Sequence, residues 1–396
     1  MKYEFDFNKE YGIVLEGGGA KGAYQIGVWK AFLECNVKIK GVSGVSVGAL
    51  NGALITMGNF EEAEKLWSEL TYSSIMDVDD EIMDKLMNGK LRDLKLKDLS
   101  KELVKFIADR GINITPLKEL INEWVDEEKI STSKIEFVMG AFLINKLKEI
   151  EISAWEADKN YIKDYLLASA YLPAFRNEKL HGLKYLDGGI INSVPIDMLL
   201  NRGYKDIIVV RIYGIGIEKP VKIPSDVNII EIAPRINLGG ILEFDSKKIQ
   251  KNIKLGYLDG LRLLRGLRGK IYYINWDLEE KDCLMFFFHV NESVKMALLE
   301  YYKLDYTNAK IYIRLFIESV CSMLASTLRL SKDWTYTELL IACIELSAKT
   351  LRIPKYNIYT REEILENINL KYEKIKVNEQ TIDLLPLLVL KMITIS

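Results

Sequence analysis

Two serines stand three residues apart in the glycine-rich stretch KGVSGVSVGALNG, residues 40–52. The second, Ser46, is the centre of a G-x-S-x-G pattern that it forms with Gly44 and Gly48. Between a strand and a helix, this pattern makes a sharp turn that exposes the serine hydroxyl as a nucleophile. Ser43 lacks the required spacing, so we predict it to be a strand-end or turn residue. A plain turn with a serine helix cap is the structural alternative for Ser46.

A second glycine-rich stretch, EGGGAKG at residues 16–22, lies nearer the N-terminus. Three of its glycines fit the G-x-G-x-x-G pattern of dinucleotide-binding loops, namely Gly17, Gly19 and Gly22. The carboxylate that a dinucleotide site needs after the second strand is missing, because that region reads VKIKGVSG. The loop is not a Walker A motif either, since a glycine follows Lys21. It predicts backbone N–H donors at a helix N-terminus, which suit an oxyanion as well as a phosphate.

A serine hydroxyl is a weak nucleophile and needs a neighbouring base. The chain has two histidines, His181 in a polar turn and His289 in an apolar run. A triad in the order Ser46, Asp187, His289 would fit an α/β-hydrolase, although only two strands are predicted before the serine. Asp187 itself ends a predicted strand and is followed by Gly188 and Gly189. This aspartate is a base at neutral pH only if burial raises its pKa, and an ordinary Asp-Gly turn is the alternative.

The elements that must position these residues alternate along the first part of the chain. Apolar runs predict strands at 11–16 and 39–46, each followed by a helical pattern, at 20–34 and 47–58. This strand-helix alternation predicts βαβ units and a parallel sheet. Further strands are predicted at 134–144, 149–155, 184–189, 206–214 and 228–233, with the first two of these as a pair. A helix at 161–172 is expected to stop at Pro173.

Two segments carry helical patterns without strand signals. Residues 73–128 are charged and predict a helical insertion that covers the sheet. From about residue 242 onward the pattern is helical, at 242–267, 308–330 and 335–352. The C-terminal LLPLLVLKMI, residues 384–393, is too short to span a bilayer. We expect it to be a docked helix or tail, with an interfacial membrane contact as the alternative.

Composition excludes several classes of protein. A net charge of −2 over 396 residues argues against broad nucleic-acid binding, which needs a basic face. The four cysteines lack paired spacing, so they predict reduced thiols rather than a disulfide framework or a zinc site. Neither a signal peptide nor a run of about 18 uncharged apolar residues is apparent. We therefore expect a cytoplasmic protein, with contact to a membrane limited to its surface.

Taken together in this order, the glycine loop GGGAKG, the elbow GVSVG and the box DGG resemble the signature of the patatin-like phospholipase family. Three longer stretches add to the resemblance, namely ASAYLPAF at 168–175, DGGIINSVPIDMLLNRG at 187–203 and PRINLGGILEFDSKKIQKNIKLGYLDG at 234–260. The resemblance implies a patatin-like catalytic domain at 9–265 with the insertion at 73–128. It does not cover the α-helical C-terminal region at 266–396.

The family resemblance implies a three-layer α/β/α sandwich and a Ser-Asp dyad that uses neither a histidine nor a metal or other cofactor. By this resemblance Ser46 attacks a lipid ester and Asp187 is the base. The backbone N–H groups of Gly17, Gly18 and Gly19 would hold the oxyanion. Motif-supporting roles fall to Lys21, Gly22, Gly44, Gly48, Gly188 and Gly189. The implied activity is that of a phospholipase A-type acyl hydrolase.

Two residues depart from the family pattern, since Glu16 and Lys21 stand where the family often has Asp and Arg. Lysine lacks the planar, bidentate bonding of arginine. Peripheral contact with lipid is expected through the C-terminal region or through the lysine-leucine stretch at 94–106. A histidine-triad carboxylesterase and a non-enzymatic nucleotide-binding module remain the alternative functions.

Overall fold

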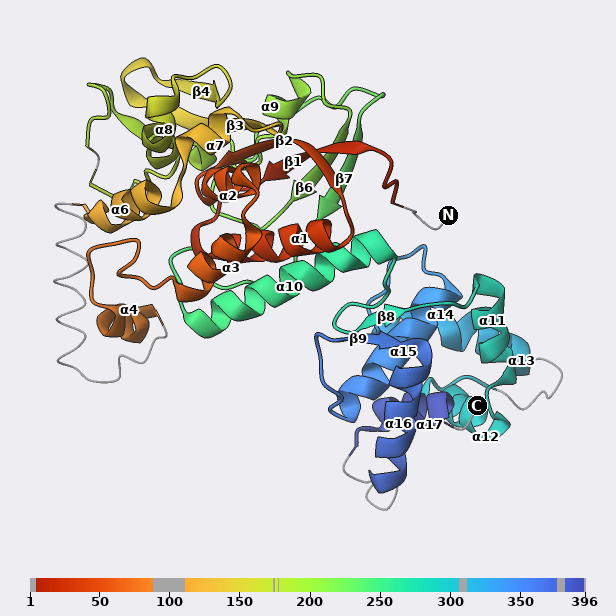
Figure 1. Ribbon diagram of the computed structural model, residues 1–396. Helices are drawn as coiled ribbons and strands as arrows, with labels where there is room; N and C mark the ends of the chain where they lie inside the picture. Colours follow the sequence, from red (N-terminus) through yellow and green to blue (C-terminus); the bar gives the residue numbers. More distant parts are fainter. Residues whose placement is uncertain are drawn as a thin grey trace. The chain divides into compact units, whose positions relative to one another are not determined.

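The computed structural model describes residues 5–87, 111–173, 175–176, 178–305, 312–375 and 382–394. The chain divides into two compact units, Phe5–Leu263 and Leu264–Ser396 (Figure 1). The first contains the three motifs, and the second is the mainly helical C-terminal region.

The first unit is built on a seven-stranded sheet in the order β4-β3-β2-β1-β6-β7, with β5 pairing to β3. Its strands are β1 (Glu10–Leu15), β2 (Lys38–Val45), β3 (Glu136–Leu143), β4 (Lys148–Ser153), β5 (Tyr185–Asp187), β6 (Asp206–Val210) and β7 (Asn228–Ile232). Neighbouring strands from β3 through β2, β1 and β6 to β7 are parallel, whereas β4 and β5 run antiparallel to β3. The predicted parallel sheet and the predicted pairing of the strands at 134–144 and 149–155, here β3 and β4, are both confirmed.

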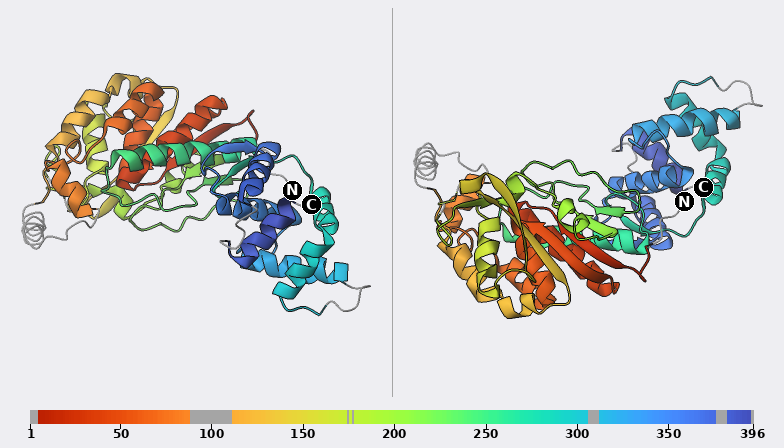
Figure 2. Two further views of the ribbon diagram at one scale, coloured as in Figure 1. Left: turned by 90° about the horizontal axis from the view of Figure 1, so that it is seen from below. Right: turned by 90° about the horizontal axis from the view of Figure 1, so that it is seen from above.

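Helices cover both faces of this sheet. Its principal helices are α1 (Ala23–Glu34), α2 (Val47–Met57), α3 (Phe60–Glu69), α8 (Ile162–Ser169), α9 (Ile196–Leu200) and α10 (Ser246–Arg265). Val14 of β1 packs with Leu199 of α9 on one face. On the other face, α10 lies alongside α1 (Figures 1 and 2). This arrangement is the predicted three-layer α/β/α fold.

Two glycines let α1 and α10 approach each other closely. A Cβ on Gly27 of α1 would lie 1.9 Å from the Ile253 carbonyl oxygen. A Cβ on Gly256 of α10 would lie 1.9 Å from the carbonyl oxygen of Tyr24. Any larger residue would push the two helices apart, because the obstacle in each case is backbone.

The described parts of the predicted insertion contain helices joined by turns and loops. They contain α4 (Asp80–Met87), α6 (Thr115–Trp124) and the start of α7 (Glu127–Ser131). An isolated bridge joins Ile112 to Phe175. Residues 88–110, which include the lysine-leucine stretch at 94–106, lie outside the described residues.

The second unit has its own core. Its helices are α11 (Glu280–His289), α12 (Glu292–Tyr301), α13 (Tyr312–Leu315), α14 (Cys321–Thr327), α15 (Tyr336–Thr350), α16 (Arg361–Ile375) and α17 (Leu384–Thr394), with a π-helical turn at Phe316–Val320. A two-stranded parallel sheet, β8 (Tyr273–Asn275) with β9 (Ile358–Thr360), was not predicted. Leu388 and Val389 of α17 are buried in this core, which confirms the docked helix. Within the described ranges, no helix is long and apolar enough to span a membrane.

Candidate active site

The register of β3 brings Ser46 and Asp187 to the same place. The pairing of β2 with β3 ends at Val45 opposite Gly140. The next residue of β3, Ala141, pairs instead with Asp187 of β5. Since β5 is antiparallel to β3, the ends of β2 and β5 face each other. Ser46 directly follows β2, so the serine and the aspartate lie where the two strands meet.

Ser46 occupies the turn between β2 and α2 with φ 55° and ψ −130°. Residues other than glycine rarely adopt this region of backbone conformation, and holding one there costs about 1–3 kcal/mol. The flanking glycines permit the turn: a Cβ on Gly44 would lie 2.3 Å from the Gly48 carbonyl oxygen, and one on Gly48 would lie 2.3 Å from that of Leu15. The predicted sharp turn is therefore present at Ser46.

Two neighbouring serines have structural roles. The Ser46 N–H donates to Ser169 Oγ at 2.9 Å, and the Ser169 hydroxyl donates to the Gly140 carbonyl at 2.6 Å. Ser169 thereby ties the turn to β3. The sequence alone does not predict this role, because nothing in ASAYLPAF distinguishes a serine that bonds to two other segments. Ser43 is buried in β2 and donates to the Pro195 carbonyl, as expected for a strand residue.

Asp187 is 1% exposed, and its own N–H donates to the Tyr171 carbonyl. Burial raises the pKa of this carboxyl from 3.8 to about 6, although the nearby Ser46 side chain and the Gly189 N–H both favour the charged form. Its Oδ1 accepts the Gly189 N–H at 2.7 Å. Its Oδ2 is buried without a hydrogen-bond partner among the described residues. One oxygen is thus fixed, and the other is open to receive a proton.

The glycine loop approaches Ser46 directly. A Cβ on Gly17 would lie 3.3 Å from the Ser46 Cβ. The sequence predicts Gly17 as an oxyanion donor, but its N–H donates to the Ser193 carbonyl at 3.1 Å. The N–H groups of Gly18 and Gly19 have no acceptor in the described part of the chain. We therefore retain these two as candidate oxyanion donors, with Gly17 as the residue that allows the close approach.

One further candidate donor was missed by the sequence analysis. Val47 begins α2 directly after the serine, so its N–H has no partner within the helix. In nucleophile elbows the residue after the nucleophile commonly contributes to the oxyanion hole. Its position in GVSVG is the signal that would have identified it.

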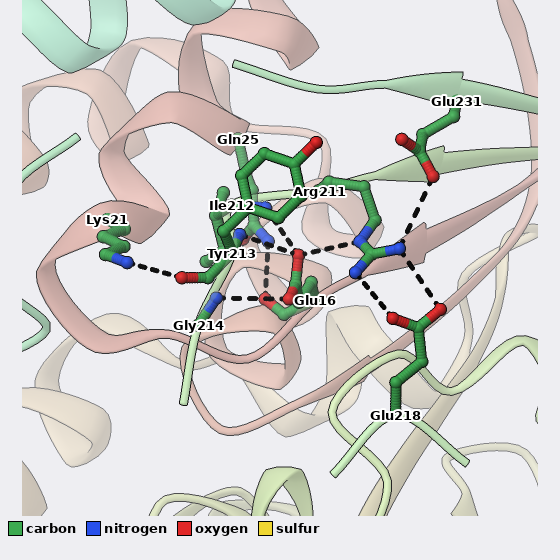
Figure 3. A network of polar contacts seen from close by, with 9 residues as sticks. All are labelled: Glu16, Lys21, Gln25, Arg211, Ile212, Tyr213, Gly214, Glu218 and Glu231. Atoms are coloured by element: carbon green, nitrogen blue, oxygen red, sulfur yellow. Dashed lines mark hydrogen bonds and ion pairs between the residues drawn. The ribbon is translucent and has the colours of Figure 1, made fainter. Parts of the chain in front are cut away.

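Glu16 fixes the loop behind the glycines (Figure 3). Its carboxylate is 2% exposed and accepts hydrogen bonds from three consecutive backbone N–H groups, those of Ile212, Tyr213 and Gly214, at 2.6, 3.0 and 3.1 Å. The Arg211 side chain donates to the same carboxylate at 3.1 Å. The residue that departs from the family pattern thus has a structural role.

Lys21 and the remaining predicted glycines also pack around this centre. The Lys21 ammonium donates to the Tyr213 carbonyl, while burial lowers its pKa and Glu16 opposes that effect. A Cβ on Gly22 would lie 2.5 Å from a Val47 methyl group, and one on Gly188 would lie 2.5 Å from the Gly140 carbonyl oxygen. These residues support the backbone rather than face the cavity.

Neither histidine is among the described residues that line the cavity beside Ser46. His181 Nε2 bonds to the Asp164 carboxylate at 2.6 Å, and its ring packs edge-on against Tyr161. His289 ends α11 in the second unit, where its Nδ1–H donates to the Met285 carbonyl.

Ser46 lines a cavity with about 790 Å³ of space, part of it open to solvent. Its walls are mainly apolar and come from α2, α3, α6 and the segments at 170–175 and 242–244; they include Leu66, Trp67, Leu117, Ile121, Trp124 and Phe244. Asn51 is a polar residue in the wall, but its amide is already bonded to Gly22, Gln25 and Trp67. The cavity therefore suits a hydrocarbon chain beside a nucleophilic hydroxyl.

Comparison with known proteins matches residues 13–200 to the family described as patatin-like phospholipase. Neuropathy target esterase sws of Drosophila melanogaster is 29% identical over 205 residues, which is 51% of this chain and 13% of that protein. Patatin-like phospholipase domain-containing protein 6 of Homo sapiens is 26% identical over 205 residues, 50% and 13% respectively. The chain thus spans about an eighth of the length of these relatives. Among solved structures, VipD from Legionella pneumophila aligns with a TM-score of 0.37 and 14% identity, over 96% of this chain and 90% of that one.

Proposed function

We propose that the chain is a lipid acyl hydrolase of phospholipase A type. The proposal starts from the match of residues 13–200 to the patatin-like phospholipase family. The observation that carries the proposal is the meeting of β2 and β5 next to an apolar cavity that Ser46 lines. A serine in an elbow and an aspartate with one unpartnered oxygen lie there together. The substrate class is a carboxylic ester of a lipid, and the Ser46–Asp187 dyad is the proposed machinery.

In the first half-reaction, Ser46 Oγ attacks the ester carbonyl carbon while Asp187 Oδ2 takes the hydroxyl proton. The carbonyl oxygen becomes an oxyanion that the N–H groups of Gly18, Gly19 and Val47 would stabilise. Collapse of this intermediate breaks the bond to the leaving alcohol, which takes the proton from Asp187. The acyl group remains on Ser46 as an ester.

In the second half-reaction, water replaces the alcohol. Asp187 takes a proton from the water molecule as the water oxygen attacks the acyl carbon. Collapse of the new intermediate releases the fatty acid and returns the proton to Ser46 Oγ. The apolar cavity would hold the acyl chain through both steps, so the ester carbon stays beside the same donors.

Asp187 can be the base because its environment changes its strength. A group with a pKa of about 6 is still mainly ionised at neutral pH. It is also a stronger base than an exposed aspartate, whose pKa lies near 3.9. General bases work best when their pKa lies close to the working pH. Burial thus supplies by desolvation what an imidazole supplies in triad enzymes.

The pH dependence of hydrolysis tests this assignment. We expect kcat/KM for a soluble ester to rise about tenfold per pH unit below pH 6 and to level off above it, because only the carboxylate accepts the proton. The profile should be measured in wild type and in a His181→Gln/His289→Gln double variant. Loss of the rising limb in the double variant would assign it to an imidazole and contradict the dyad.

The function itself is tested by fatty acid release from mixed phospholipid vesicles, alongside labelling with a fluorophosphonate probe. Release together with labelling that is lost in Ser46→Ala supports a lipid acyl hydrolase. Labelling and cleavage of soluble esters without release from any lipid would make the chain a carboxylesterase instead. Absence of labelling would overturn the proposed nucleophile.

A further inference from the structure

The loop that follows β6 exposes apolar side chains directly beside the candidate active site. Within residues 213–223, which we call the docking loop, Tyr213 is 52% exposed, Ile215 73%, Ile217 60% and Ile223 39%. Large apolar side chains are normally scattered singly on a soluble surface. Four of them in eleven consecutive residues mark this loop as an interaction surface.

The docking loop is fastened to two of the catalytic motifs. A Cβ on Gly214 would lie 1.8 Å from the Gly17 carbonyl oxygen, and one on Gly216 would lie 1.9 Å from that of Gly189. The loop therefore touches both the glycine loop and the segment after Asp187. Its apolar side chains are exposed at the same edge of the sheet where Ser46 and Asp187 meet.

Backbone bonds also hold the loop in one conformation. The Ile217 N–H donates to the Ile190 carbonyl at 3.1 Å, and the Ile217 carbonyl accepts the Ser193 N–H at 2.8 Å. The Arg211 guanidinium lies over the Tyr213 ring at 5.5 Å from its centre. Because this geometry is already fixed, a partner that binds here pays little for ordering the loop.

The charges around the docking loop are mostly satisfied within the protein. Arg211 pairs with Glu16, Glu218 and Glu231 (Figure 3). Lys219 pairs with Glu149 at 3.0 Å and with Asp197 at 2.7 Å. Of the charged residues in the loop, this leaves the exposed Lys222. The loop thus offers apolar contact rather than a basic patch.

We propose that the docking loop inserts into the surface of a lipid aggregate and so presents the active site to its substrate. This inference rests on the proposed function, since an insoluble ester must be reached at an interface. A protein seated on this loop would lie against two catalytic motifs, whereas a lipid surface there supplies the substrate. Apolar side chains on a preformed loop gain free energy by entering the acyl boundary.

The test is binding of the full chain to phosphatidylcholine vesicles, measured by flotation in the Ser46→Ala background so that no lipid is consumed. We expect Ile215→Ser/Ile217→Ser to weaken binding by about 30-fold or more. The matched control is Leu370→Ser/Leu384→Ser in the second unit, where the two leucines are 57% and 58% exposed. This control should change binding by less than about threefold, because these leucines lie outside the docking loop.

Salt separates the proposed contact from an electrostatic one. Raising the salt from about 0.1 M to 1 M should change vesicle binding less than about twofold, since screening acts on charges. Four results would each overturn the proposal that the docking loop binds lipid. They are strong salt dependence, a requirement for anionic lipid, an equal loss of binding in the control variant, and no vesicle binding by the parent chain.

Failure of this inference is distinguishable from failure of the proposed function. In the wild-type background, hydrolysis of a soluble monomeric ester reports the catalytic centre, while vesicle binding reports the loop. Vesicle binding that depends on the loop, without any lipid hydrolysis, would support the docking proposal and contradict the proposed function. A collapse of soluble ester hydrolysis in Ile215→Ser/Ile217→Ser with vesicle binding intact would show that the loop acts on the site, and would overturn docking.

Discussion

Replacing Ser46 by alanine is expected to lower kcat for ester hydrolysis by at least about 10³-fold, because no other group can form the acyl-enzyme. The fold should be retained, since the variant only removes a hydroxyl group from the cavity wall. The backbone of the elbow keeps the same conformation, which is as strained for alanine as for serine. Release of fatty acid or of a chromogenic alcohol at saturating substrate measures the effect.

The matched control for this variant is Ser43→Ala, three residues earlier. Its hydroxyl is buried and donates to the Pro195 carbonyl at 3.0 Å. Removing it deletes one buried hydrogen bond and should cost about 1 kcal/mol of unfolding free energy. The activity of the folded protein should stay within about tenfold of wild type, because this side chain does not line the cavity. Comparable loss of activity in both variants would show that Ser46 is not the nucleophile.

Asp187→Asn is the second substitution with a large expected effect, and its two consequences have opposite signs. Hydrolysis should fall by about 10³-fold or more, because an amide cannot take the serine proton. Stability at neutral pH should increase. The folded protein raises the pKa of this carboxyl from 3.8 to about 6, so above that pH it holds a charge that burial disfavours.

The size of the stability gain follows from the same shift. Two pKa units correspond to about 3 kcal/mol, and the new amide N–H group without a partner takes back about 1 kcal/mol. A net gain of about 2 kcal/mol is therefore expected above pH 6. The advantage should shrink as the pH falls from about 6 to 3.8, and it should vanish only below 3.8, where the wild-type carboxyl is mainly protonated in both the folded and the unfolded state.

Urea unfolding of wild type and Asp187→Asn at pH 7.5 and pH 4 measures this difference. Either of two results would mean that the buried Asp187 carboxylate does not destabilise the folded protein. One is a variant less stable than wild type at pH 7.5, and the other is a stability difference that does not depend on pH. Glu149→Gln offers a control carboxyl, since Glu149 pairs with Lys219 and is not among the residues that line the cavity. That variant should keep its activity.

The sequence was informative where the physical signal is local. Apolar runs identified β1, β2, β6 and β7, and the elbow pattern located the turn at Ser46. By contrast, β8 and β9 have three residues each, which is too short for an alternating pattern, and no motif marks them as the DGG motif marks the equally short β5. The end-to-end meeting of β2 and β5 was also out of reach, because it depends on the register of a third strand, β3.

The same limit applies to individual donors and bridges. The sequence makes Gly17, Gly18 and Gly19 equivalent, yet the Ser193 carbonyl engages the first of them. Ser193 lies far away in the chain, so only tertiary structure distinguishes the three. Likewise, Ser169 bonds to both the Ser46 N–H and Gly140, and its role arises from contacts between α8 and β3.

The Glu16 carboxylate has a consequence for redesign of the chain. It accepts hydrogen bonds from the backbone N–H groups of residues 212–214, and these bonds anchor the start of the loop from the protein interior. Beyond Gly214, the side chains at 215, 217 and 223 point to solvent and carry none of these bonds. Under the proposed docking, we expect the side chains of that short stretch to tolerate replacement by side chains suited to a different lipid aggregate, because the bonds that position the loop lie upstream of them.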